Sequence, residues 1–290
     1  MQFRQRVRDA LERFRMLDAA KALTTACLGS TRFRRICTSD FTSGKVAFGE
    51  KNRYVLPVFP LRWVRVDFDG ADINLDLNRR PRLPFADASQ RVLYASHLVE
   101  HLDEESFRHF VRECHRILAP TGALRIETPD AEFLVASYRR RDEAVLGHFR
   151  AIRHSNLVTR LGLPAKYLAD HLTVLGELSS YIDHDINSGH IPAYASAVEF
   201  EDKLATLELD AFTRWCVSLQ TDEQLASGGH QNWMSWGKLA TELDQAGFRR
   251  VTRVEYGKTG ILQLKLNRGR GCIREKPHRA FYSLYVEAFK

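Results

Sequence analysis

The sequence predicts an α/β fold in which a doubly wound, Rossmann-like sheet carries helices on both faces. Two observations support this prediction. Between Lys45 and Glu127, short apolar runs of strand length alternate with segments whose apolar residues recur at helical spacing. The same alternation resumes after residue 229, so two separate parts of the chain are expected to build one sheet.

Four strands and one clear helix are expected in the first part of the sheet. The strands are the apolar runs Lys45–Phe48, Trp63–Phe68, Arg91–Ala95 and Ala123–Glu127. Asp103 can cap the helix that follows the third run, and Glu104 and Glu105 suit its first turn. Its apolar stripe consists of Phe107, Phe110, Val111, Cys114, Ile117 and Leu118. Pro120 and Gly122 are expected to end this helix.

A second part of the sheet is expected after residue 229. A helix from Ser235 ends at Gly247, and strands follow at Arg250–Tyr256 and Ser283–Phe289. The pattern therefore divides the chain into four segments. They are a basic helical extension at 1–44, an α/β core at 45–145, a helical and loop insert at 146–228 and the C-terminal part of the core at 229–290. The insert is expected to cover the carboxyl ends of the strands, where ligands bind in such sheets.

The composition is that of a soluble globular protein. Of the 290 residues, 44% are hydrophobic and 27% are charged, which argues against a disordered, collagen-like or membrane-spanning chain. No apolar run approaches the ~18 residues of a membrane helix, and the N-terminal segment lacks the pattern of a signal peptide. The five cysteines are scattered and form no Cys-x-x-Cys pair, so neither a disulfide framework nor a cysteine zinc site is indicated. We therefore expect a cytoplasmic protein.

The net charge of +7 is concentrated at the front of the chain, where residues 1–44 hold nine basic and four acidic side chains. Apolar residues between the arginines recur at helical spacing, which predicts a basic amphipathic helix. Its apolar stripe either packs on the main domain, the interpretation we favour, or makes a peripheral contact with an anionic membrane. Nucleic acid is a weaker expectation, because no binding module or set of interleaved stacking aromatics accompanies the arginines.

Three stretches of the chain resemble the class I S-adenosylmethionine-dependent methyltransferases, in particular the branch that modifies small molecules and glycans. The first joins Trp63–Asp67, Ala71–Leu77 and Leu83–Asp87. The second runs from Tyr94 to Leu102 and on through Ile126 to Asp130, and the third joins His230–Trp233 to Ser283–Ala288. The resemblance implies a Rossmann-like class I methyltransferase sheet, S-adenosylmethionine as cofactor, and O-methylation of a sugar, glycan or other small polar acceptor. The segment 45–145 would then bind the cofactor, and the insert would cap the substrate.

The resemblance also assigns residues to the cofactor. Asp67 ends the second strand, where a carboxylate can accept both hydroxyl hydrogens of a ribose; the alternative is a surface aspartate or a helix cap. Phe68 would lie against the adenine ring, and Asp76 would accept from its amino group. The full set of expected cofactor-binding residues is Gly49, Glu50, Asp67, Phe68, Asp76, Ser96 and His97.

The chain departs from the family at the loop after the first strand. Where the family has a Gly-x-Gly turn, this chain has Gly49-Glu50-Lys51-Asn52. Either Glu50 binds the α-ammonium group of the cofactor, or the pocket is degraded and the chain is an inactive binding protein. A third interpretation keeps the cofactor but transfers or cyclises its aminocarboxypropyl group. Smaller departures are Gln90-Arg91, where the family commonly has Phe-Asp, and Thr121 in its usual Gly-Gly turn.

The candidate catalytic residues are His101, Glu100 and His230. Methylation of a hydroxyl is helped by a general base, and His101 could be that base with Glu100 orienting it. The alternative is a capping and packing cluster. His230 precedes the last helix, where this family often places a residue that faces the substrate.

No metal site is predicted. The residues His171, His184, Asp185 and His190 lie close together in the sequence but match no metal motif. The insert also holds aromatic residues that suit sugar faces and are expected to set substrate specificity, namely Tyr167, Tyr181, Tyr194 and Trp215. The sequence indicates neither the individual acceptor nor the oligomeric state.

Overall fold

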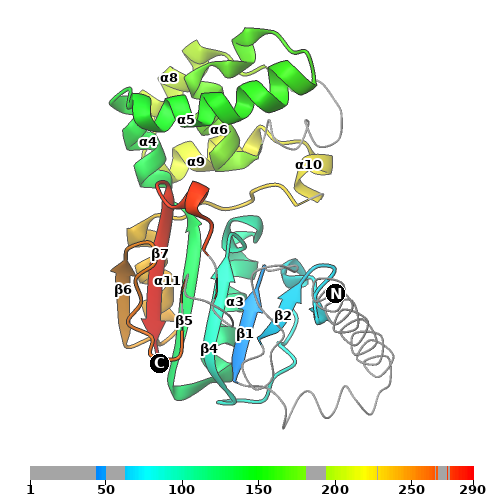
Figure 1. Cartoon of the computed structure of the whole chain (residues 1–290), viewed down its shortest axis with the longest axis vertical. Helices are drawn as coiled ribbons and strands as arrows, with labels where there is room; N and C mark the ends of the chain where they lie inside the picture. The colour runs from blue at the N-terminus through cyan, green and yellow to red at the C-terminus, as the bar shows by residue number, and fades with distance from the viewer. Residues whose placement is uncertain are drawn as a thin grey trace, which may run out of the picture.

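The computed structural model describes residues 44–49, 63–180, 194–226, 228–264, 266, 273 and 275–290. In these residues, seven strands form one sheet in the order β3-β2-β1-β4-β5-β7-β6 (Figure 1). The strands β1 to β5 run parallel, and β7 lies antiparallel between β5 and β6. The predicted Rossmann-like α/β sheet is confirmed. The strands are β1 (Lys45–Phe48), β2 (Val64–Asp67), β3 (Ile73–Asn74), β4 (Gln90–Ser96), β5 (Leu118–Pro129), β6 (Arg250–Val254) and β7 (Ser283–Phe289).

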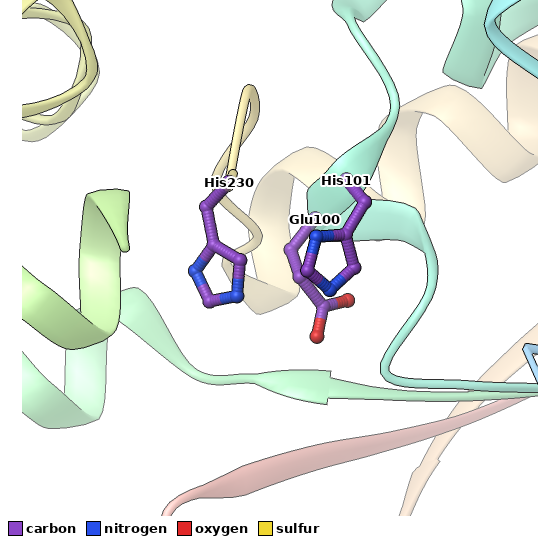
Figure 2. A group of neighbouring side chains, drawn as sticks. All are labelled: Glu100, His101 and His230. Carbon is purple, nitrogen blue, oxygen red and sulfur yellow. The ribbon is translucent and has the colours of Figure 1, made fainter. Parts of the chain in front are cut away.

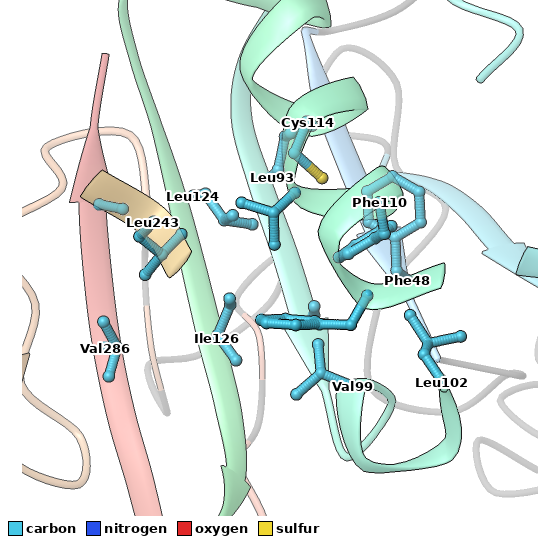
Figure 3. Packing of buried hydrophobic residues seen from close by; sticks show 14 of the residues in the cluster. Phe48, Leu93, Val99, Leu102, Phe110, Cys114, Leu124, Ile126, Leu243 and Val286 are labelled. Atoms are coloured by element: carbon cyan, nitrogen blue, oxygen red, sulfur yellow. The ribbon is translucent and has the colours of Figure 1, made fainter. Parts of the chain in front are cut away.

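The central strands β1, β4, β5 and β7 are buried on both faces of the sheet, which explains why they are apolar on consecutive positions. On one face, α3 (Glu104–Ile117) and α11 (Trp236–Gln245) pack on side chains such as Phe48 and Ile126 (Figure 3). The rings of Phe48 and Phe110 meet edge to face with centroids 5.0 Å apart. On the other face, Tyr94 packs with a cluster that includes Ile261 of the segment after β6. In the described part of the chain, this second face is covered by that segment and not by a helix.

The helix α3 begins where its capping signal predicts. The carboxylate of Asp103 accepts a hydrogen bond from the Ser106 amide at 2.7 Å. The helix ends at Ile117, and β5 starts at once with Leu118, earlier than the predicted strand. The pairing of β5 with β4 shifts after Leu118 and becomes regular from Ala123. The residues between them, which include Pro120 and Gly122, therefore form an irregular start of the strand.

A separate layer of helices lies over the carboxyl ends of the parallel strands (Figure 1). We call the segment from α4 to α10 the cap. It has its own apolar core, which includes Phe149, Leu175, Phe200 and Phe212. Its helices are α4 (Ala131–Arg139), α5 (Glu143–Arg153), α6 (Asp170–Ser179), α8 (Ala197–Thr206), α9 (Leu209–Ser218) and α10 (Asp222–Ala226). Single turns of other helical types are η1 (Leu77–Arg79), η2 (Val99–His101), η3 (His154–Arg160), η4 (Ala165–Leu168) and η5 (Pro277–Arg279).

The predicted basic helix at 1–44 lies outside the described residues except for Gly44, so its packing and its membrane contact stay predictions. Within the ranges that the structure describes, every helix is too short or too polar to cross a membrane.

One ion pair fastens the segment between β3 and β4 to helix α3. The guanidinium of Arg116 donates to both carboxylate oxygens of Glu113, at 2.8 and 2.7 Å. It also donates to the backbone carbonyls of Leu83 and Phe85, each at 3.0 Å. The Leu83 amide completes the arrangement by donating to Glu113 at 2.7 Å. Because the backbone of this segment forms hydrogen bonds with Arg116 and with Glu113, the conformation of the segment depends on both side chains.

We expect Glu113→Gln to lower the free energy of unfolding by about 1–3 kcal/mol at neutral pH, since it removes charge-assisted hydrogen bonds. Burial alone would raise the pKa of Glu113, but Arg116 and the Leu83 amide more than offset it, so the pKa lies below its usual 4.5. A lowered pKa in the folded state stabilises the fold above the unfolded pKa and stops doing so as the pH falls through the folded pKa. The difference between wild type and variant should therefore shrink below about pH 4.5.

Urea unfolding at neutral and acidic pH measures this difference. Glu105→Gln on the same helix is the matched control, because Glu105 is 69% exposed and its ion pair with Arg80 should contribute little. Equal effects of the two substitutions at neutral pH would contradict the assignment.

Candidate functional site

The carboxyl ends of β1 and β4 approach each other closely at Gly49. This glycine follows β1 with a φ of +75°, and its amide donates to the carbonyl of Val66 in β2 at 3.1 Å. A Cβ at this position would lie 2.8 Å from the carbonyl oxygen of Ser96 and 3.1 Å from the Cβ of Leu98. Only glycine fits such a turn without displacing β4. The glycine at which the sequence resembles the methyltransferase turn is therefore one that the backbone requires.

Asp67 and Phe68 lie at the end of the neighbouring strand β2. One carboxylate oxygen of Asp67 accepts a hydrogen bond from the Phe68 amide at 2.6 Å. The ring of Phe68 is 70% exposed, which is unusual for a large apolar side chain beside a strand end. Both residues are thus accessible to a ligand at the edge where β1, β2 and β4 end.

Asp76 has a local structural role. It caps η1, and its two carboxylate oxygens accept from the Asn78 amide and from Arg79 Nε, each at 3.1 Å. A contact with adenine would have to coexist with this cap. Glu50, the other candidate in the altered loop, lies outside the described residues.

A buried polar cluster follows β4. Nδ1 of His97 lies 3.1 Å from Oε1 of Glu100, and its Nε2 lies 3.7 Å from Oε1 of Glu127 and 3.2 Å from the hydroxyl of Ser283. Glu127 also accepts hydrogen bonds from the hydroxyls of Tyr94 at 2.6 Å and Ser96 at 3.2 Å. His97 thus lies between two carboxylates from different parts of the chain.

The charges of this cluster depend on one another. Burial alone would lower the pKa of His97, but Glu100 and Glu127 more than offset it and raise the pKa above its usual value. Burial alone would raise the pKa of Glu100, but the hydrogen bond and charge of His97 hold that pKa well below its usual range. Glu100 is therefore an ionised carboxylate, although it is only 2% exposed.

His101 and His230 face each other beside Glu100 (Figure 2). Their ring centroids lie 4.8 Å apart, with the ring planes at 71°. Nδ1 of His101 lies 2.7 Å from the carbonyl oxygen of Gly228, and Nδ1 of His230 lies 2.8 Å from that of Glu177. A carbonyl oxygen only accepts, so each Nδ1 carries a hydrogen, and in the neutral form of the ring the lone pair lies on Nε2. Desolvation by burial lowers the pKa of His230 to about 3, which keeps it neutral at pH 7.

Backbone hydrogen bonds bring His230 to this place. The carbonyl of Glu100 accepts from the amides of Gln231 at 2.8 Å and Asn232 at 3.1 Å. The side chain of Gln231 donates to the carbonyl of His101 at 3.3 Å. The loop before α11 is thereby fastened to η2. The three predicted catalytic residues, Glu100, His101 and His230, are brought together with Ser96 and His97.

Sequence reasoning missed two residues of the cluster, Glu127 and Thr128. Thr128 donates from its hydroxyl to Glu100 at 3.1 Å, and Glu127 is fully buried. Both lie near the end of β5, where the sequence pattern indicates only a strand and its turn. The signal that could have found them is a glutamate within an otherwise apolar run, next to the edge where ligands bind in such sheets.

The aromatic residues of the insert differ in their surroundings. Tyr167 is buried in the core of the cap, and Trp215 packs against Phe200 and Phe212 in the same core. Tyr194 is 46% exposed and remains accessible to a ligand. Tyr181, together with His184, Asp185 and His190, lies outside the described residues.

One family model matches part of the chain. Residues 23–126 match the family model of a methyltransferase domain, which covers roughly a third of the chain. This match supports a class I S-adenosylmethionine-dependent methyltransferase, and the cofactor that it implies is S-adenosylmethionine. No curated protein is similar enough to the chain to count as a match.

Several solved structures resemble the chain distantly. A SAM-dependent methyltransferase from Archaeoglobus fulgidus is 11% identical, with 89% of this chain and 91% of that chain covered at a TM-score of 0.36. An S-adenosylmethionine-dependent methyltransferase from Mesorhizobium loti is 13% identical. The match covers 91% of this chain and 100% of that chain, with a TM-score of 0.36. The CurJ carbon methyltransferase is 11% identical. The match covers 84% of this chain and 47% of that chain, with a TM-score of 0.36. Likenesses this distant identify neither an activity nor a substrate.

The residues at the strand ends fit S-adenosylmethionine. Gly49 leaves no side chain at the turn after β1, and Asp67 offers a carboxylate at the end of β2. The exposed ring of Phe68 supplies an apolar surface next to that carboxylate. A nucleoside bound at adjoining strand ends needs a carboxylate for its ribose hydroxyls, an apolar surface for its adenine ring and a turn without a side chain beside it.

We expect Gly49→Ala to destabilise the fold and to weaken binding of S-adenosylhomocysteine. Gly70→Ala is the matched control, because Gly70 has a similar φ of +71° but no atom lies within 4 Å of the place that its Cβ would take. Both substitutions strain the backbone by about 1–2 kcal/mol. Only the change at Gly49 adds a clash, which costs a further 1–3 kcal/mol or so. Urea unfolding and calorimetry measure the two effects, and equal destabilisation by both substitutions would contradict the close approach.

Proposed function

We propose that the chain is an S-adenosylmethionine-dependent O-methyltransferase that acts on a hydroxyl of a sugar, glycan or other small polar acceptor. One observation supports it above all: one ring nitrogen each of His101 and His230 lies beside the ionised carboxylate of Glu100, at the edge that fits the cofactor (Figure 2). The partner is accordingly a small-molecule or glycan acceptor.

Asp67 and Phe68 would hold the cofactor by its ribose and its adenine ring, on the turn that Gly49 forms. When bound, S-adenosylmethionine supplies a methyl group on a sulfonium, which is already a strong electrophile. The work left to the chain is to align the acceptor, to exclude water and to receive a proton. The cap lies over the strand ends and can provide the enclosure (Figure 1).

His101 would receive the proton of the acceptor hydroxyl at Nε2. Its Nδ1 hydrogen bond to Gly228 sets the orientation of the ring. The carboxylate of Glu100 would stabilise the imidazolium that forms, as a buried anion beside it. His230, held neutral, would accept a hydrogen bond from the acceptor and help to align it.

The polar character of the site favours a hydroxylated acceptor. The partly buried side chains of His101, His230 and Gln231 bring hydrogen-bonding groups to the place where their chain segments meet. A sugar presents several hydroxyls at once, so it gains from a crevice with several such groups.

We expect His101→Asn to lower kcat by about 10²–10⁴-fold, since it removes the general base. Affinity for S-adenosylhomocysteine should not change, because His101 is not among the residues expected to bind the cofactor. The assay follows consumption of S-adenosylmethionine with a panel of mono- and oligosaccharides, and mass spectrometry identifies the product.

S-adenosylhomocysteine as product marks methyl transfer, whereas methylthioadenosine would point to transfer or cyclisation of the aminocarboxypropyl group and overturn the proposal. Cofactor binding without turnover on any member of the panel would favour an inactive binding protein. His154→Asn, which changes an exposed histidine of the cap, is the control and should leave kcat unchanged.

A further inference from the structure

We infer that Glu100, His101 and His230 form a binding site for one divalent transition-metal cation of the zinc class. One potential ligand atom from each residue lies within 4.8 Å of the other two. Figure 2 shows one ring nitrogen of each histidine directed toward the carboxylate. The sequence alone predicts no metal site, because His230 is far from the other two residues along the chain.

The orientation of the rings is that of metal ligands. Metal-binding histidines usually donate their other ring N–H to a carbonyl or carboxylate, which fixes the tautomer and aims the free nitrogen at the cation. His101 does so toward Gly228, and His230 does so toward Glu177.

The carboxylate of Glu100 has the supporting contacts that a ligand needs. Oε2 accepts from the Thr128 hydroxyl at 3.1 Å, and Oε1 faces Nδ1 of His97 at 3.1 Å. Ligating carboxylates are commonly held by such outer hydrogen bonds. Glu100 can therefore keep its position while a remaining lone pair binds the cation.

The ligand set selects the class of metal. Two imidazoles and one carboxylate suit Zn²⁺ and similar transition metals, whereas Ca²⁺ and Mg²⁺ take oxygen ligands. Zinc bonds of 2.0–2.1 Å set neighbouring ligand atoms roughly 3.4 Å apart in a tetrahedron. The ligand atoms, which now lie within 4.8 Å of one another, would thus have to approach by up to roughly 1.4 Å on binding.

Three protein ligands leave a coordination position open, as in catalytic zinc sites. An acceptor hydroxyl bound there would become more acidic. In the metal-bound form Nε2 of His101 is a ligand and cannot take the proton, so the hydroxyl would lose it to water as the acceptor binds, before the site is closed for methyl transfer. This role rests on the proposed function. Binding of the metal does not, since it depends only on the three side chains and their hydrogen bonds.

The test is a calorimetric titration of the untagged full chain with Zn²⁺, and separately with Co²⁺, without S-adenosylmethionine. We expect one cation per chain, with binding weakened at least about tenfold in His101→Asn and in His230→Asn. Asparagine is chosen because its amide nitrogen can take the place of Nδ1 and keep the hydrogen bond while Nε2 is removed. The exposed His154→Asn is the matched control and should bind like wild type.

X-ray absorption at the cobalt edge of the wild-type complex counts its imidazole ligands and needs no variant, so it decides the matter even if a substitution unfolds the chain. Two imidazoles are expected. Absence of binding by the folded wild type, a count below two, or equal affinities in all three variants would overturn the site. Metal binding without S-adenosylhomocysteine binding would refute the proposed function alone, and the reverse result would refute the metal site alone.

Discussion

The buried carboxylate of Glu100 is the group on which the site depends. An ionised carboxylate removed from water is costly unless hydrogen bonds and opposite charges compensate it. Thr128 and His97 provide that compensation from β5 and from the turn after β4. The backbone carbonyl of the same residue accepts from Gln231 and Asn232, which precede α11. One residue therefore joins three chain segments and determines where His230 lies.

The sheet places this junction beside the cofactor edge. Parallel β1, β2 and β4 end on one side, so Gly49, Asp67 and Ser96 lie at neighbouring strand ends. The antiparallel β7 starts at that same edge, and its first residue, Ser283, contacts His97. The cap is connected there as well, because the amide of Ala131 at the start of α4 donates to the carbonyl of Met234 at 2.9 Å. The strand ends that fit the cofactor, the polar cluster around His97 and the start of the cap thus meet in one region.

Much of the fold could be predicted because local signals agree with burial. Strands buried on both faces read as apolar runs, and Asp103 caps α3 as its position indicates. The start of β5 could not be predicted, since Pro120 and Gly122 usually mark a turn.

The site could be predicted only in part. Glu100 and His101 are adjacent in sequence, but the contact with His230 depends on long-range hydrogen bonds, and Glu127 is hidden within a strand pattern. The cap that Asp76 makes on η1 depends on backbone geometry that spacing alone does not show.

The measurement that tests the account most directly is calorimetric titration of S-adenosylhomocysteine into wild type, Asp67→Ala and Asp69→Ala. Asp69 is an exposed aspartate just beyond β2, which makes it the matched control for loss of a carboxylate. We expect wild type and Asp69→Ala to bind S-adenosylhomocysteine equally well. In Asp67→Ala the affinity should fall roughly tenfold to hundredfold, which is the effect of removing a charge-assisted hydrogen bond. Equal affinities in all three proteins, or absence of binding by a cooperatively folded wild type, would contradict a cofactor site at the strand ends.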